Sequence, residues 1–197
     1  MTTDKNAPDG IYRIRSLYFD TPYDRALLEK INGYNIREKY RLRLYNGNPD
    51  FIKLEKKTKI NGLCNKESIV ISKELAHSLS KGVIEAATPE TPPLLAELYS
   101  RMATMLLHPK TIVDYTREAF TFPAGNVRVT IDSNIRTSVS GTDFLNPECI
   151  TIPIPNDSII LEIKWDEFLP SVIRDAVALP SRRTGAFSKY AISRVYG

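Results

Sequence analysis

The sequence predicts an α+β fold in which an antiparallel sheet curls toward a barrel. Three observations support this prediction: short segments alternate apolar and polar residues, Asn-Gly turns join several of them, and few segments carry a helical repeat. A chain of 197 residues is long enough to bury one sizeable core. We expect residues 1–10, which are polar and rich in turn formers, to be a flexible lead-in to a single domain over residues 11–197.

The N-terminal half begins with a predicted strand, Tyr12–Phe19, followed by a helix over residues 23–31. Thr21 and Pro22 are typical of a helix start, because a hydroxyl caps free N–H groups and proline suits the first helical position. Asn-Gly turns then separate three strands, which we expect to form a meander. These strands cover residues 35–45, 51–59 and 64–71.

Helices and strands alternate in the rest of the chain. Ser72 is a typical cap for a helix that reaches about residue 81, and apolar residues at helical spacing predict another helix over residues 94–107. The elements expected after it are strands over 111–120 and 127–132 with an extension over 135–139, a loop over 144–157, a strand over 158–165, and helices over 170–179 and 187–196.

The strands of the meander have one apolar face and one basic face. Because side chains alternate along a strand, Lys39, Arg41 and Arg43 share a face opposite apolar neighbours, and Lys53 and Lys57 repeat the pattern on the next strand. Such a face needs counter-charge, and guanidinium and ammonium groups suit phosphate oxygens. A solvated surface is the alternative for any single strand, but recurrence on several strands favours a concave sheet that binds polyanions.

Later strands repeat the pattern with a few carboxylates added. The charged or polar residues on these faces are Tyr115, Arg117, Arg128, Thr130, Asp132, Glu162 and Lys164. If the faces converge, cations and carboxylates line one cavity, which suits a polyphosphate chain with a divalent metal ion.

Glu55 and Glu162 are the candidate metal ligands. For Glu55, an ion pair with Lys53 or Lys57 on the same face is favoured over metal binding. Glu162 lies in a more apolar strand, where an inward carboxylate requires a partner, so metal binding is favoured there.

Ser188 and Lys189 open the last predicted helix. A helix start offers free N–H groups to an anion, and these two residues add a hydroxyl and an ammonium. The alternative is an ordinary cap followed by a solvated lysine.

The composition limits which binding partners and which cellular compartment are expected. The net charge of +4 and the pI near 9.0 allow nucleic acid, an anionic surface or a phosphorylated small molecule as a partner. Cys64 and Cys149 form no CxxC motif, so we expect no disulfide framework or zinc site and a cytoplasmic location. We also expect no transmembrane segment or signal peptide. Walker, GxGxxG, HExxH and nucleophile-elbow motifs are missing, which leaves acyl transfer and dinucleotide chemistry unsupported.

Seven segments, spread in order over nearly the whole chain, carry a family resemblance. They are YRIRSLYFDT (residues 12–21), KYRLR (39–43), KLEKK (53–57), DYTR (114–117), NVRVTID (126–132), LEIK (161–164) and FSKY (187–190). Together they resemble the VTC domain, the polyphosphate polymerase domain of the vacuolar transporter chaperone complex, which also has bacterial relatives. This domain belongs to the triphosphate tunnel metalloenzyme, or CYTH-like, superfamily.

The resemblance implies an antiparallel β-barrel tunnel with flanking helices, in which the γ-phosphate of ATP is transferred to a growing polyphosphate chain with Mn²⁺ or Mg²⁺. It implies that Glu162 binds the metal ion and that Ser188 and Lys189 act on the phosphate at the tunnel end. The residues implied to bind substrate phosphates are Arg41, Arg43, Lys53, Lys57, Lys66, Tyr115, Arg117, Arg128 and Lys164.

One departure from the family pattern keeps other functions open. The family usually begins with a strand of alternating Glu, Lys and Arg and then a helix, and the eleven residues before Tyr12 carry neither. We expect a barrel that lacks a wall strand, with an exposed edge that favours a homodimer. An inorganic triphosphatase and a non-catalytic polyphosphate or inositol-phosphate binding module are therefore the alternatives. Nucleic acid is not expected, because aromatic residues do not interleave with the basic ones.

Overall fold

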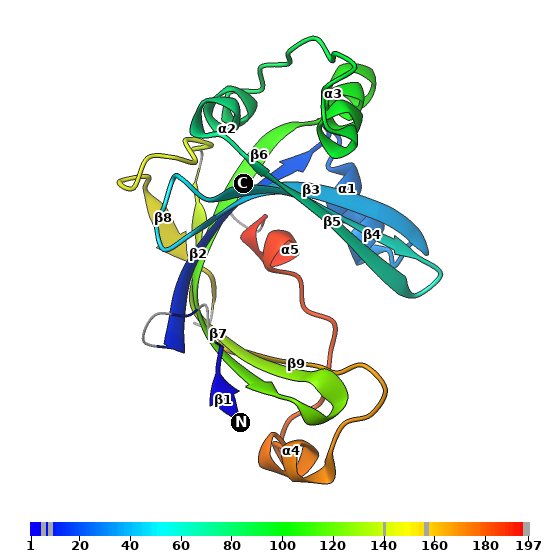
Figure 1. Cartoon of the computed structure of the whole chain (residues 1–197), viewed down its shortest axis with the longest axis vertical. Helices are drawn as coiled ribbons and strands as arrows, with labels where there is room; N and C mark the ends of the chain where they lie inside the picture. Colours follow the sequence, from blue (N-terminus) through cyan, green and yellow to red (C-terminus); the bar gives the residue numbers. More distant parts are fainter. Residues whose placement is uncertain (5–6, 8–9, 140, 156–157, 195–197) are drawn as a thin grey trace.

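In the computed structural model, the chain forms one strongly curved, mostly antiparallel sheet with helices packed against it (Figure 1). The structure describes residues 1–4, 7, 10–139, 141–155 and 158–194. The strand order is β5-β4-β3-β2-β6-β7-β8, with β1 beside β6 and β9 beside β7. Within these residues no ladder joins β5 to β8 or β9. The predicted α+β class is confirmed, whereas the sheet is open and a closed barrel is not observed.

The predicted meander is confirmed as β3 (Ile36–Tyr45), β4 (Ile52–Ile60) and β5 (Leu63–Ile71). The two-residue turn between β4 and β5 explains their register. Asn61 and Gly62 both have positive φ angles, 48° and 90°, and this turn geometry matches the twist of the flanking strands. Ile60 therefore pairs directly with Leu63, and the two strands stay in register along their full length.

The strand β2 (Ile11–Asp20) joins the two halves of the sheet, because it pairs with β3 on one side and with β6 on the other. The helix α1 (Arg25–Ile31) follows it. The helix begins two residues later than predicted, so Pro22 does not occupy its first position. The predicted capping role of Thr21 is confirmed, because its hydroxyl accepts the Arg25 N–H at 3.2 Å. The buried Asp20 carboxylate adds a cap that was not predicted, since it accepts the backbone N–H groups of Ala26 and Leu27 at 2.8 and 3.1 Å.

The second half of the sheet consists of β6 (His108–Phe122), β7 (Val127–Ser138), β8 (Thr151–Pro153) and β9 (Ile160–Lys164), with a 3₁₀ turn, η2 (Ala124–Asn126), between β6 and β7. The predicted strands are confirmed, and β7 includes the expected extension. The prediction of a loop over residues 144–157 was wrong at β8, because Thr151–Pro153 pairs with β7.

The first residues pair with the sheet rather than leading loosely into it. The strand β1 (Thr2–Thr3) pairs with β6, the Asp4 N–H donates to the Ala119 carbonyl, and Asp4 is buried. Of the flexible lead-in predicted over residues 1–10, residues 5–6 and 8–9 lie outside the described part of the chain.

The predicted helices are present with shifted ends. They are α2 (Lys73–Ser80), α3 (Pro93–Met105), α4 (Ser171–Ala176) and α5 (Lys189–Ser193). Ser72 caps α2 as predicted, because its side chain accepts the Leu75 N–H at 3.1 Å. The last helix starts two residues later than predicted, and residues 195–196 of the prediction lie outside the described residues. No described helix has the length and apolar character needed to cross a membrane.

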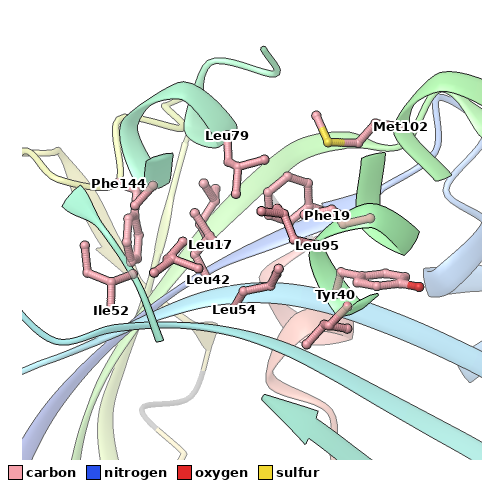
Figure 2. Packing of buried hydrophobic residues seen from close by; sticks show 14 of the residues in the cluster. Leu17, Phe19, Tyr40, Leu42, Ile52, Leu54, Leu79, Leu95, Met102 and Phe144 are labelled. Carbon is pink, nitrogen blue, oxygen red and sulfur yellow. The ribbon is translucent and has the colours of Figure 1, made fainter. Parts of the chain in front are cut away.

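The largest apolar core lies on the outer side of the sheet, beneath α2 and α3 (Figure 2). Leu17, Leu42 and Leu54, from β2, β3 and β4, are fully buried there against helix residues that include Leu79. A smaller core, around Val129 of β7, lies against α4. Because strand side chains alternate, burying these residues on the outer side turns their neighbours toward the inner face of the sheet.

Candidate functional site

A cavity of about 780 Å³ lies on the inner face of the curved sheet. All twelve residues that the family resemblance assigns to the site line it, so the faces converge as predicted; their chemical roles stay predictions. These residues are Arg41, Arg43, Lys53, Lys57, Lys66, Tyr115, Arg117, Arg128, Glu162, Lys164, Ser188 and Lys189. We call the inner face of β3, β4 and β5 the first wall, and the inner face of β6, β7 and β9 together with α5 the second wall.

Glu55 organises the cations of the first wall. Its side chain is almost fully buried, and its carboxylate contacts Arg41 at 2.7 Å and Lys66 at 2.5 Å. The predicted partners, Lys53 and Lys57, were wrong, because Arg41 stands directly opposite Glu55 in the β3–β4 ladder and so lies closer. Burial opposes ionisation of Glu55, but the surrounding cations outweigh it and lower the pKa of this carboxyl to about 2. Glu55 is therefore ionised and held in a cluster of ion pairs.

Three lysines of the first wall form no ion pair with any described carboxylate: Lys39, Lys53 and Lys57. Lys39 and Lys57 stand directly opposite each other in the ladder, where like charges are unfavourable. Burial, together with the charges of Arg41 and Lys57, lowers the pKa of Lys39. This part of the wall carries positive charge that the described residues leave unbalanced, so it favours an anionic ligand.

Two tyrosines support the arginines of the first wall. The Tyr18 hydroxyl accepts a hydrogen bond from Arg41 at 3.1 Å, and the Tyr115 hydroxyl accepts one from Arg43 at 3.1 Å. Burial of Tyr18 favours the neutral phenol, but the nearby cations, Arg41 and Lys39 foremost, outweigh it and lower its pKa to about 7. A phenol in this position changes charge near neutral pH.

Asp132 organises the cations of the second wall. It is fully buried on β7, and its two carboxylate oxygens accept hydrogen bonds from Arg117 at 2.6 and 2.8 Å. The Lys189 ammonium contacts the same carboxylate at 2.5 Å and lies 4.7 Å from the centre of the Tyr115 ring. Burial raises the pKa of Asp132, but Arg117 and Lys189 lower it by more. Asp132 thus joins the last helix to the sheet.

The helix α5 is held in place from its other side as well. The Tyr190 hydroxyl donates to buried Asp20 at 2.5 Å, and Arg194 contacts Asp24 at 3.1 Å. The Ser188 hydroxyl accepts the Ala191 N–H at 3.3 Å, which is the ordinary cap given as an alternative above. Lys189 is consequently directed into the cavity by the fold around it.

Glu162 is the best available metal ligand on the second wall. Its carboxylate is 41% exposed and lies 3.5 Å from Lys164 and 3.9 Å from Arg117, farther than the shortest ion pairs of Glu55 and Asp132. The described residues contain no cluster of three or more His, Cys, Asp or Glu that could hold a metal ion alone. One loosely paired carboxylate fits Mg²⁺ or Mn²⁺ only if substrate phosphates supply further oxygen ligands.

The sequence did not assign three residues of the site. Lys39 was placed on the basic face, but nothing distinguished it from a solvated lysine. Asp132 was placed beside Arg128 and Thr130, yet its pairing with Arg117 depends on the β6–β7 register. Tyr18 gave no signal, because β2 is buried on both faces from Ser16 onward, and Tyr18 stands there between the apolar residues Leu17 and Phe19.

Comparison with protein families identifies the chain. The family model of the VTC domain matches residues 1–196. This chain belongs to the VTC domain family. The match covers nearly its whole length, agrees with the superfamily placement, and indicates a polyphosphate-related function for this VTC domain.

Other comparisons add little to the family match. No curated protein matches the chain significantly. One solved structure, described as the PH1819 protein from Pyrococcus horikoshii OT3, is 13% identical to this VTC domain, with a TM-score of 0.38 over 85% of this chain and 70% of that chain. A likeness this distant indicates neither substrate nor reaction.

Proposed function

We propose that this VTC domain is a metal-dependent polyphosphate polymerase that transfers the γ-phosphate of ATP to a growing polyphosphate chain. The observation that carries the proposal is that ten cationic or phenolic residues, together with Glu162 and Ser188, line one cavity. The unpaired lysines of the first wall add to it, since they have charge available for a polyanion.

The reaction needs little covalent chemistry from the protein. A terminal oxygen of the polyphosphate chain attacks the γ-phosphorus of ATP, the bond to the β,γ-bridging oxygen breaks, and ADP leaves. Catalysis then rests on holding two anions in line and stabilising the charge on the transferred group. The cations of the two walls face this space from opposite sides, with Arg41 and Arg43 on one and Lys189 on the other.

A bound Mn²⁺ or Mg²⁺ would neutralise phosphate charge, and Glu162 would hold it. The other acidic residues in or near the cavity fit this role poorly. Asp4 lines the cavity and contacts Arg128 at 2.8 Å. Glu55 and Asp132, which do not line it, each contact two cations at 2.5 to 2.8 Å, so metal binding would leave those cations unpaired.

The experiment is a product assay with ATP and Mn²⁺, in which polyphosphate is resolved on a stained gel and released orthophosphate is measured alongside. We expect a ladder of polymer. Lys57→Ala should reduce polymer yield, whereas Lys73→Ala, which removes an exposed lysine of α2 away from the cavity, should not. Orthophosphate without polymer would replace the proposal with a triphosphatase. The absence of both products, with tripolyphosphate still bound, would replace it with a binding module.

A further inference from the structure

Aromatic side chains gather at one end of the first wall. Tyr45 ends β3, and Phe51 immediately precedes β4, across the turn from it. Their ring centres are 6.3 Å apart, and the Tyr12 ring meets Tyr45 edge to face at 6.2 Å. All three rings line the cavity, and Phe51 is 42% exposed. An exposed ring at the rim of a basic cavity offers a flat apolar surface that binding of phosphate alone does not require.

The two neighbouring strands both change from aromatic to basic in the same direction. Read from the turn between β3 and β4, the inner face of β3 presents Tyr45, then Arg43, then Arg41. Along the neighbouring strand β4, Phe51 is followed on the same face by Lys53. Arg43 and Lys53 are register partners, and the Lys53 ammonium lies 5.0 Å from the centre of the Phe51 ring. The step from ring to cation is two residues, about 7 Å along a strand, a span that a ribose can bridge.

A hydrogen-bond donor lies beside these rings. The Asn46 Oδ1 atom accepts the Arg13 N–H at 2.8 Å, which directs the Nδ2 group away from that bond. Asn46 is exposed and lines the cavity, and its Nδ2 has no partner in the described part of the chain. An amide N–H at this place suits the acceptor nitrogens of a purine ring.

We propose that Phe51, Tyr45 and Asn46 form a nucleobase subsite, which binds the purine of a nucleoside triphosphate and directs its phosphates toward Lys39 and Lys57. The inference rests on the proposed function and adds the orientation of the bound nucleotide to it. The base lies at the turn between β3 and β4, and the phosphates extend along the first wall. The other cavity rings are less suited. Tyr18 and Tyr115 are buried, each with two cations close to its ring, and Phe187 has no ring neighbour among the described residues.

The test compares binding of ATP and of inorganic tripolyphosphate by calorimetry. Stacking of a base on an aromatic side chain predicts that Phe51→Ala weakens ATP binding about tenfold. Tripolyphosphate binding should stay within about twofold, because no cation is removed. Phe51→Trp should retain ATP binding, and Phe168→Ala, which removes an exposed ring outside the cavity, should leave both ligands unchanged. Thermal unfolding of each variant checks that the fold is kept.

A fluorescent probe gives an independent readout. The emission of 2-aminopurine riboside triphosphate should be quenched on binding to the unsubstituted protein and to Phe51→Trp, but much less on binding to Phe51→Ala. The subsite is overturned if Phe51→Ala weakens the binding of ATP and of tripolyphosphate equally, or if it weakens neither. It is also overturned if Phe187→Ala, rather than Phe51→Ala, selectively weakens ATP binding. If the protein binds tripolyphosphate but not ATP, the subsite is overturned, and only the role of the cavity in binding anions is kept. If the unsubstituted protein binds neither ligand, the proposed function fails as well.

Discussion

Among the described residues that line the cavity, the first wall carries six cations and the second wall four, and the two walls balance them differently. On the second wall, each cation has a carboxylate partner: Asp132 pairs with Arg117 and Lys189, Asp4 with Arg128, and Glu162 with Lys164. On the first wall, Glu55 pairs with Arg41, Arg43 and Lys66, while Lys39, Lys53 and Lys57 form no ion pair with the described residues.

The difference separates two tasks that a basic cavity must perform. Paired cations are held in fixed positions before a ligand arrives, which suits orientation of the reacting groups. Unpaired cations repel one another until an anion binds, so ligand binding gains from relieving that repulsion. We therefore expect the first wall to contribute most of the affinity, and the second wall to contribute most of the turnover.

The largest expected effect comes from removing the carboxylate that orders the second wall. Asp132→Asn leaves two partly buried cations without their buried partner, and the cost of a broken buried ion pair is about 3–5 kcal/mol. We expect the free energy of unfolding, measured with urea, to fall by this amount and polymer yield to collapse. Asp166→Asn, at an exposed aspartate beyond β9, is the matched control. A change in the free energy of unfolding below about 1 kcal/mol would show that Asp132 does not hold the wall together.

The second-largest expected effect is a difference between the two walls in how much they contribute to tripolyphosphate affinity. Lys39→Ala combined with Lys57→Ala should weaken tripolyphosphate binding about a hundredfold, because two charge-assisted contacts are lost. Arg128→Ala combined with Lys164→Ala should weaken it less than tenfold, since these cations are already paired. Calorimetry at two salt concentrations measures the tripolyphosphate affinity of both double variants. The salt dependence of that affinity should decrease more for the Lys39 and Lys57 variant. Equal losses would remove the distinction between the walls.

A single substitution on the second wall should separate turnover from binding. Lys189→Ala should lower kcat about a hundredfold, as expected when one preorganised cation near the transferred phosphate is lost, with affinity changed by less than about threefold. Ser188→Ala should have a smaller effect, because that hydroxyl caps α5. Steady-state kinetics and direct binding together test this. Full polymer yield from Lys189→Ala would exclude this residue from the reaction.

The smallest effect is a pH dependence of the first wall. The pKa of Tyr18 is about 7, so raising the pH through neutrality converts the phenol to phenolate and adds negative charge beside Arg41. Tripolyphosphate affinity should therefore be higher below pH 7 and decline a few-fold above it, on top of the ligand's own titration. Tyr18→Phe should flatten the protein's part of this profile. Identical pH profiles for the two proteins would show that Tyr18 keeps its proton.

Much of the fold follows from local pattern. The alternation in β3 and β4 predicted which side chains point inward, and the Asn61-Gly62 turn predicted the hairpin between β4 and β5. Prediction was weaker where a distant partner decides the structure. The strand β8 exists because β7 offers it a ladder, and the first turn of α1 is capped by the buried Asp20 carboxylate as well as by the predicted Thr21 hydroxyl.

The sequence by itself determined the composition of the cavity. A two-residue repeat is a property of each strand alone, so it assigned Arg41, Arg43 and Lys57 to the inner face without knowledge of the sheet.

Only the tertiary structure decided how those charges are balanced. Which carboxylate meets which cation depends on ladder register and on the curvature that brings α5 to β7, and neither is encoded in any one segment. Glu55 therefore pairs with Arg41 across the ladder, and Asp132 meets Lys189 from 57 positions away in the chain. For the same reason, only the structure shows that one wall of the cavity is balanced while the other keeps its charge for a ligand.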